Sequence, residues 1–254
     1  MVEVLGDELE CRFIGPPPGA ARTIVFLHEG LGSVSLWRDF PDRLLEGTGL
    51  GGMVYSRAGY GASSPRPGPW PVEFMHHEAM TVLPAMLAAC GIRDPIFFGH
   101  SDGGSIALLF AAAFPGAVHG QVLEAAHVFV EDVCVARIGQ LAERSAGSAV
   151  RRGLARRHGA NAGPLFAAWT QVWLCPEFRR WNITAALPAV RCPTLVLQGE
   201  DDEYGTALQV ETIAAAISGP VETALLAGCG HAPHVERPES VLELVRPFLR
   251  SLAG

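Results

Sequence analysis

The sequence has no apolar run near the length of about 18–20 residues that a helix needs to cross a bilayer. Its first residues, Met-Val-Glu-Val-Leu-Gly-Asp-Glu, are acidic and lack the basic start and apolar segment of a signal peptide. The six cysteines are scattered, without a Cys-x-x-Cys pair or a dense framework, which is typical of reduced thiols. These absences predict a cytoplasmic protein that does not bind a membrane.

Positive charge is also scarce. The 254 residues carry a formal net charge of -7, which argues against binding to the phosphate backbone of nucleic acid. No His-x-x-x-His or Cys-x-x-Cys pair occurs, so we expect no metal, and no other cofactor is expected. There is no internal repeat, and the length fits one large domain or a core with an inserted subdomain. We expect a small-molecule substrate and a monomer or homodimer.

The chain is organised around one short stretch that contains a serine. An apolar run at 96–98 predicts a buried strand, and Gly-x-Ser-x-Gly follows at Gly99, Ser101 and Gly103. An apolar run of helical length comes next and ends at Pro115-Gly116. Strand, tight turn and helix in this order are the context that the nucleophile-elbow motif requires, so we predict that Ser101 is a nucleophile.

Apolar strands alternate with helical segments through much of the chain. The predicted strands lie near 9–14, 23–28, 53–56, 96–98, 121–127, 194–198 and 221–226. This alternation predicts an α/β fold, a mostly parallel sheet with helices on both faces. Ligands bind such sheets at the carboxyl ends of the strands, where His28, Arg57 and His127 also occur.

Residues 128–186 interrupt the alternation. They contain only helix-like segments, near 131–144, 147–158, 162–174 and 177–183. We interpret them as a helical lid over the strand ends, and residues 1–127 and 187–254 as the α/β core.

Arginines and tryptophans are concentrated in the expected lid. We interpret the arginines as a solvated helix face rather than an anion site. The tryptophans either pack within the lid or line a pocket. Phe129, Trp169 and Trp173 are our candidates for contact with a substrate.

A serine hydroxyl needs a base before it can attack, and the base needs an acid that orients it. The candidate acids follow the strand at 194–198 and are Glu200, Asp201, Asp202 and Glu203. The candidate bases follow the last strand and are His231 and His234. The order serine, acid, histidine is the order expected of nucleophile-elbow enzymes.

Four motifs in this order resemble those of the α/β-hydrolase superfamily, in particular its lid-bearing esterases and meta-cleavage-product hydrolases. They are His28-Glu-Gly-Leu-Gly, Ser56-Arg-Ala-Gly-Tyr-Gly-Ala-Ser63, Gly199-Glu-Asp-Asp202 and Gly228-Cys-Gly-His231. The resemblance implies the α/β-hydrolase fold and a triad of Ser101, Asp202 and His231, with Asp201 as the rival acid. It also implies an oxyanion hole between the backbone N–H groups of Gly30 and Asp102.

The resemblance narrows the chemistry as well. Related dehalogenases and epoxide hydrolases have an aspartate at the position of Ser101, whereas a serine favours acyl chemistry. We therefore expect a serine hydrolase of small carboxylic esters or related acyl compounds. A carbon–carbon bond hydrolase of a dienoate-type ketone and a non-catalytic ligand-binding homologue are the alternatives.

The oxyanion loop departs from the family pattern at Glu29, where glycine is usual. A carboxylate here would oppose a developing negative charge, so we predict that Glu29 is buried and paired with Arg57, His127 or Arg38. The alternative is a solvated carboxylate. Glu29, His127 and, in the acid turn, Tyr204 complete the expected substrate-binding residues.

Overall fold

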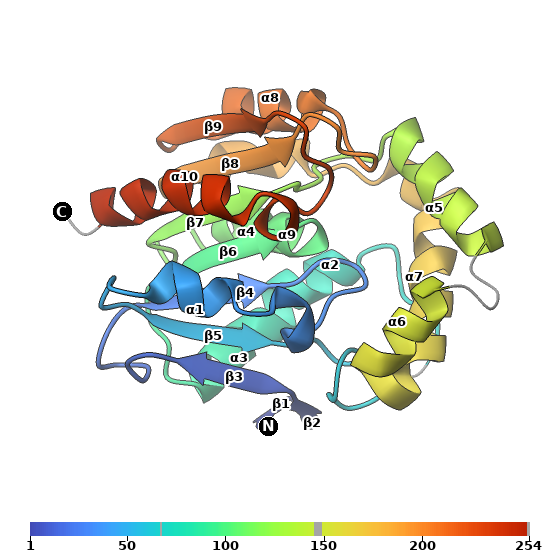
Figure 1. Cartoon of the computed structure of the whole chain (residues 1–254), viewed down its shortest axis with the longest axis horizontal. Coiled ribbons are helices and arrows are strands. Elements are labelled where there is room, and N and C mark those ends of the chain that lie inside the picture. Colours follow the sequence, from blue (N-terminus) through green and yellow to red (C-terminus); the bar gives the residue numbers. More distant parts are fainter. Residues whose placement is uncertain (67, 145–148, 253–254) are drawn as a thin grey trace.

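The computed structural model describes residues 1–66, 68–144 and 149–252. Its centre is a seven-stranded sheet with the order β3-β5-β4-β6-β7-β8-β9 (Figure 1). Strand β3 pairs antiparallel with β5, and the other neighbours pair in parallel. The strands are β3 Cys11–Ile14, β4 Thr23–Leu27, β5 Gly51–Tyr55, β6 Ile96–His100, β7 Gly120–Glu124, β8 Thr194–Gly199 and β9 Val221–Leu226. The predicted mostly parallel sheet is confirmed.

The expected first strand at 9–14 is divided in two. Strand β2 (Asp7–Leu9) pairs with β1 (Val2–Val4) in a separate antiparallel ribbon, and β3 begins at Cys11. The break has a local cause at Glu10, whose N–H donates to Ser63 Oγ and whose carbonyl accepts from the Ser56 N–H. The backbone of this residue therefore bonds to a loop instead of continuing one strand.

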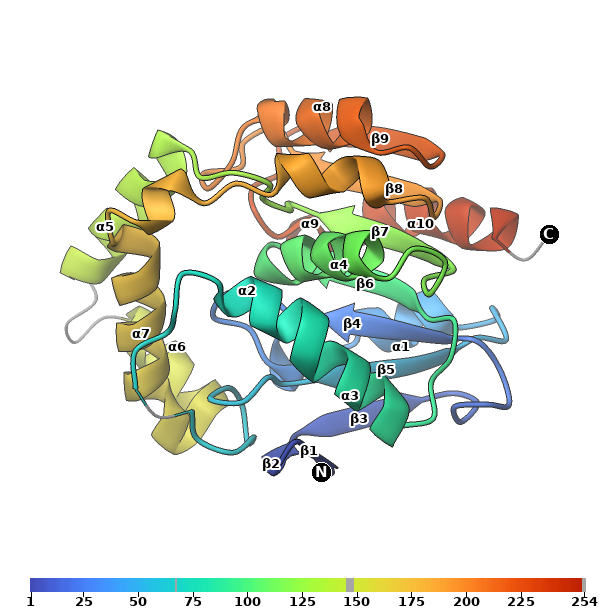
Figure 2. The same cartoon turned by 180° about the vertical axis from the view of Figure 1, so that it is seen from behind.

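Helices cover both faces of the sheet (Figures 1 and 2). One face carries α1 (Phe40–Leu45), α9 (Pro233–Glu236) and α10 (Pro238–Ser251), and the other carries α2 (Phe74–His77), α3 (Leu83–Ala89), α4 (Asp102–Ala113) and α8 (Ala207–Ala216). Side chains alternate along a strand, so Ile24 and Phe26 of β4 join the core that includes Phe40 of α1. Val25 and Leu27 join the opposite core.

The helical stretch from Phe74 to Ala89 is irregular in the turn before Pro84. A π-helical turn, Glu78–Val82, separates α2 from α3, and Pro84 lies in the first turn of α3. Pro84 has no N–H to donate to the carbonyl four residues earlier, at Met80 in the π turn, and its ring crowds that carbonyl. The irregularity therefore precedes the proline.

The chain between β7 and β8, here the β7–β8 segment, holds helices α5 (Asp132–Arg144), α6 (Ala149–His158) and α7 (Ala162–Leu174). They stand beside the carboxyl ends of the parallel strands (Figure 1). The helix expected at 177–183 is wrong, because only a short 3₁₀ turn forms there, at Phe178–Arg180. Residues 147–148 of another expected helix lie outside the described residues. Among the described helices, none combines the length and apolar character needed to cross a bilayer.

Candidate active site

Ser101 lies in a sharp turn between β6 and α4, with φ 53° and ψ -116°. Positive φ is unfavourable for a residue with a Cβ, and such strain is typical of functional turns. The two flanking glycines have a steric cause. A Cβ on Gly99 would lie 2.5 Å from the Gly103 carbonyl oxygen, and a Cβ on Gly103 would lie 2.0 Å from the Leu27 oxygen. The turn can therefore form only with glycine at both positions.

The structure brings together three side chains that are far apart in sequence. The Ser101 hydroxyl lies 3.0 Å from His231 Nε2, and His231 Nδ1 lies 2.8 Å from Asp202 Oδ1. The rival acid is elsewhere, since Asp201 is exposed and its N–H donates to the Cys229 carbonyl. Asp202 also accepts the Tyr204 N–H at 2.8 Å, which fixes the carboxylate.

The electrostatics of the Asp202–His231 pair favour charge on both groups. Burial lowers the pKa of His231, but the hydrogen bond and charge of Asp202 outweigh burial and raise it. Burial raises the pKa of Asp202, while the bond to His231 outweighs this and lowers it. The imidazole is therefore a stronger base than a free histidine.

The loop that carries His231 is held by groups behind it. His100 Nε2 donates to the His231 carbonyl at 2.7 Å, and burial lowers the pKa of His100 to about 3, so this imidazole is neutral. Glu124 Oε1 accepts the His234 N–H at 2.6 Å, and the His234 Nδ1 lies 3.0 Å from the same oxygen. Sequence reasoning missed Glu124, although an acid inside the apolar strand expected at 121–127 could have indicated it.

The loop after β4, which is expected to supply an oxyanion donor, is held by Arg57, which is 2% exposed. Its guanidinium donates to the carbonyls of His28 at 2.8 Å and Glu29 at 3.1 Å. Gly30 lines the cavity beside Ser101, and Asp102 is the first residue of α4, where an N–H has no intrahelical partner. The two expected oxyanion donors therefore flank the serine.

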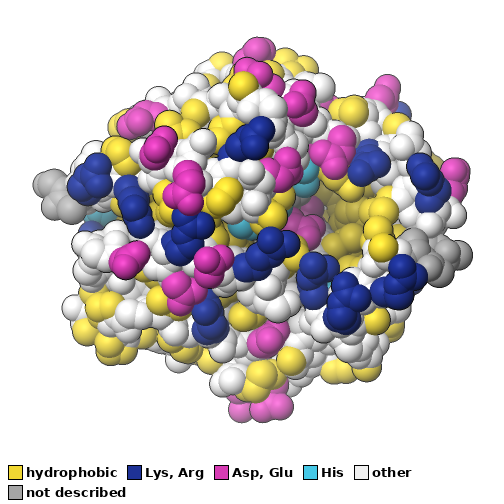
Figure 3. Space-filling model, viewed as in Figure 1, with side chains coloured by type: hydrophobic (Ala, Val, Ile, Leu, Met, Phe, Trp, Pro, Cys, Tyr) yellow, Lys and Arg dark blue, Asp and Glu magenta, His cyan; other side chains and the backbone are white. Residues whose placement is uncertain are grey.

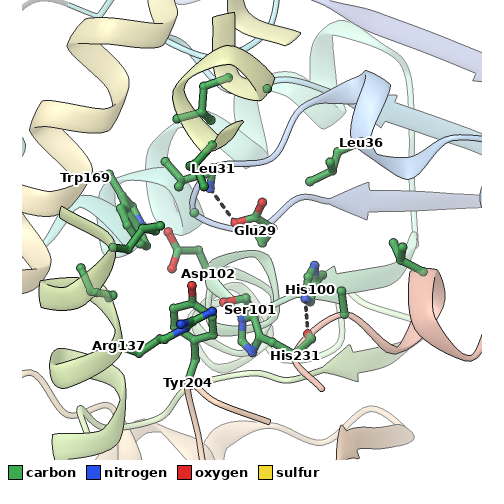
Figure 4. A pocket seen from close by; sticks show the side chains of 18 of the residues that line it. Glu29, Leu31, Leu36, His100, Ser101, Asp102, Arg137, Trp169, Tyr204 and His231 are labelled. Carbon is green, nitrogen blue, oxygen red and sulfur yellow. Dashed lines mark hydrogen bonds between the residues drawn. The ribbon is translucent and has the colours of Figure 1, made fainter. Parts of the chain in front are cut away.

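The prediction that the Glu29 side chain pairs with Arg57, His127 or Arg38 is wrong. Its carboxylate accepts the Leu31 N–H at 2.6 Å, within its own loop (Figure 4), whereas the Arg57 guanidinium donates to the Glu29 backbone carbonyl. The side chain is neither fully buried nor in open solvent, because it borders the cavity. Burial raises its pKa. Burial also raises the pKa of Asp102, to about 7, against the effect of Arg57, whose Nη2 is 3.9 Å away.

A cavity of about 610 Å³ extends from Ser101 to α5, α6 and α7. Of the expected substrate-binding residues, five line it, namely Glu29, His127, Trp169, Trp173 and Tyr204. Phe129 is a wrong prediction. It forms a β-bridge with Asn182 at the base of the β7–β8 segment, and its ring packs against the core.

Sequence reasoning missed an apolar stripe on α5 that also lines the cavity. Cys134, Ile138 and Leu141 belong to it, and their spacing of four and three residues places them on one helix face. That spacing is visible in the sequence. Arg38, Arg137, Arg156 and Arg157 line the cavity too, so the last three do not lie only on the solvated helix face expected for the lid arginines. Within the described ranges, no group of three His, Cys, Asp or Glu side chains is placed to hold a metal ion.

The chain is similar in sequence and in fold to known proteins. A family model described as the alpha/beta hydrolase family matches residues 24–244. Serine hydrolase BPHL of Homo sapiens is 28% identical over 162 residues, which cover 59% of this chain and 53% of that protein. The match thus spans about half the length of that relative.

Two solved structures illustrate the likeness of fold. An esterase from Thermogutta terrifontis has a TM-score of 0.72 at 21% identity, covering 99% of this chain and 97% of that one. An enol-lactonase from Burkholderia xenovorans LB400 has a TM-score of 0.75 at 20% identity, covering 97% of this chain and 98% of the other. At these identities the likeness shows the fold alone.

Proposed function

The chain belongs to the alpha/beta hydrolase family, and on that premise we propose that it is a serine hydrolase of small carboxylic esters or related acyl compounds. The observation that carries the proposal is the continuous relay from the Ser101 hydroxyl through His231 to Asp202, with contacts of 3.0 and 2.8 Å. A protein that only bound ligands would have no physical need for an aligned nucleophile, base and acid.

In the proposed reaction the Ser101 oxygen attacks the carbonyl carbon of the ester. The hydroxyl proton passes to His231 Nε2, and Asp202 stabilises the imidazolium that forms. The N–H groups of Gly30 and Asp102 bind the tetrahedral oxyanion. When the intermediate collapses, the alcohol leaves with the proton from His231, and an acyl-enzyme remains. Water then attacks the acyl carbon while His231 Nε2 takes its proton, and the bond to Ser101 breaks as that proton returns to the serine oxygen, which releases the carboxylic acid.

We further propose that residues 128–186 act as a lid over a core of residues 1–127 and 187–254. Helices α5–α7 supply one side of the cavity that contains Ser101, so they set the shape of the acyl or alcohol site. Side chains on these helices would then determine which substrates are preferred, whereas side chains at the strand ends would carry out the bond breaking.

The decisive experiment measures turnover of 4-nitrophenyl acetate and butyrate by the wild type and by Ser101→Ala. The variant should lose turnover by several orders of magnitude while it keeps the wild-type thermal transition. A fluorophosphonate should label the wild type at Ser101. Label at another residue, or an active alanine variant, would refute the nucleophile.

A carbon–carbon bond hydrolase of a dienoate-type ketone is the second candidate. The arginines that line the cavity favour it, because such a substrate carries a carboxylate. Loss of the dienoate chromophore measured beside ester turnover distinguishes the two. A higher kcat/KM for the ketone would replace the ester assignment.

A further inference from the structure

The mouth of the catalytic cavity is bordered by arginines from three separate parts of the chain. Arg38 follows the 3₁₀ turn Val34–Trp37, Arg137 lies on α5, and Arg156 and Arg157 lie in the last turn of α6. In Figure 3, dark-blue side chains lie along the edge of a hollow that has hydrophobic walls. The sequence contains no lysine, so each of these cations is a guanidinium.

The four arginines differ in their partners. Arg137 lies 3.4 Å from Glu203 and above the Tyr204 ring, so its charge is partly balanced. The guanidinium groups of Arg38, Arg156 and Arg157 have no hydrogen bond or ion pair to another residue in the described part of the chain, and these side chains are exposed. Three like charges that border one opening attract an anion to it, because their fields add.

Apolar side chains form part of the cavity wall inside this rim, beside the carboxylates of Glu203 and Glu236. Leu31 comes from the oxyanion loop, Ile138 and Leu141 from α5, and Leu154 from α6. A substrate that fills the cavity therefore meets the oxyanion donors at one end, hydrocarbon in the middle and guanidinium groups at the other end. A guanidinium presents paired N–H donors that match carboxylate and phosphate oxygens.

We propose that the natural substrate is an ester or thioester that carries a carboxylate or phosphate group, which Arg38, Arg156 and Arg157 bind at the cavity mouth. This rests on the proposed hydrolase function of Ser101. The anion identifies one end of the substrate, and the apolar wall requires a hydrocarbon spacer between that end and the acyl carbon.

The test compares substrates matched in shape. Mono-4-nitrophenyl glutarate carries a carboxylate, and 4-nitrophenyl methyl glutarate is its neutral counterpart. At low salt the wild type should prefer the carboxylate by about tenfold in kcat/KM, since exposed guanidinium contacts are individually weak but add. The preference should shrink as sodium chloride screens the charges. Butyryl-coenzyme A, a thioester with phosphates, is measured beside 4-nitrophenyl butyrate to identify a phosphate source.

The variants identify the binding groups. The double variant Arg156→Gln/Arg157→Gln should lower the ratio of anionic to neutral kcat/KM severalfold, mainly through a higher KM for the anion. Arg250→Gln removes one guanidinium from the far end of α10, outside the cavity, and serves as the control, with an unchanged ratio. A wild type with no preference for either anionic substrate, or a double variant with the wild-type ratio, would overturn the proposal.

The outcomes separate this inference from the proposed function. Ester turnover that depends on Ser101 but ignores the anion refutes only the substrate class. Absence of Ser101-dependent turnover on every ester refutes the hydrolase assignment, and the anion site with it.

Discussion

Replacing Arg57 with lysine should slow catalysis although the residue has no contact with the triad. Arg57 donates to the carbonyl of Glu29 at 3.1 Å. That carbonyl belongs to the same peptide as the Gly30 N–H, the proposed oxyanion donor. A guanidinium on the oxygen polarises the peptide and fixes the direction of its N–H. Lysine keeps the charge but cannot reach the carbonyls of both His28 and Glu29 with one planar fork.

The size of the effect follows from the hydrogen bonds that the substitution removes. A hydrogen bond to a charged group contributes about 1.5–3 kcal/mol. If Arg57→Lys loses one such bond from the oxyanion loop, and the loss is felt in the transition state, kcat should fall about 10- to 150-fold, since each 1.36 kcal/mol is about tenfold. The KM should change less, because the ground-state carbonyl needs the donor less than the oxyanion does.

The assay is kcat for 4-nitrophenyl butyrate, divided by the number of active sites titrated with a fluorophosphonate. A urea transition for each protein separates slower chemistry from unfolding. Arg66→Lys is the matched control, because Arg66 also pairs with a buried carboxylate, Glu78 at 3.1 Å, but does not border the catalytic cavity. Wild-type kcat in a folded Arg57→Lys variant would refute the reasoning.

Four further predictions concern the pH dependence of activity, the acid Asp202, the pH dependence of stability and the cavity wall. Activity should rise as His231 loses its proton, with a midpoint above the ordinary value of about 6.5, because Asp202 raises this pKa; a kcat/KM profile with a lower midpoint contradicts this, and Asp202→Asn should lower kcat by about 10⁴-fold. Between about pH 4 and pH 7 the folded protein holds a proton on Asp102 that the unfolded chain has lost, so stability should fall as pH rises through this window. Asp102→Asn has no carboxylate to titrate and so lacks this fall in stability. The melting temperature of the variant minus that of the wild type should therefore increase from pH 4 to pH 7, and a difference that stays constant would contradict the argument. Trp169→Ala should shift chain-length preference among 4-nitrophenyl esters, while Phe129→Ala, which lies outside the cavity, should lower the urea midpoint and leave the preference unchanged. If both variants changed the chain-length preference equally, the distinction between a cavity residue and a core residue would be wrong.

Much of the fold could be predicted from the sequence because its signals are local. The buried strand, the glycines around Ser101 and the helix that follows are contiguous, and each reflects a steric or hydrophobic requirement of its own neighbourhood. The alternation of apolar strands and helices likewise identified a parallel sheet, since only strands covered on both faces are apolar throughout. The division of the first strand at Glu10 was missed, because its cause is a loop more than forty residues away.

The partners of the polar groups were decided by the tertiary structure. Ser101 and His231 are 130 residues apart and meet only because β6 and the loop after β9 end at the same edge of the sheet. The sequence placed Glu29 beside the oxyanion loop, but it could not show that a neighbouring N–H would satisfy the carboxylate while Arg57 took the backbone. A sequence determines which groups need a partner, since burial and charge follow from residue type. Which partner is within 3 Å depends on how distant segments pack, and only the folded chain decides it.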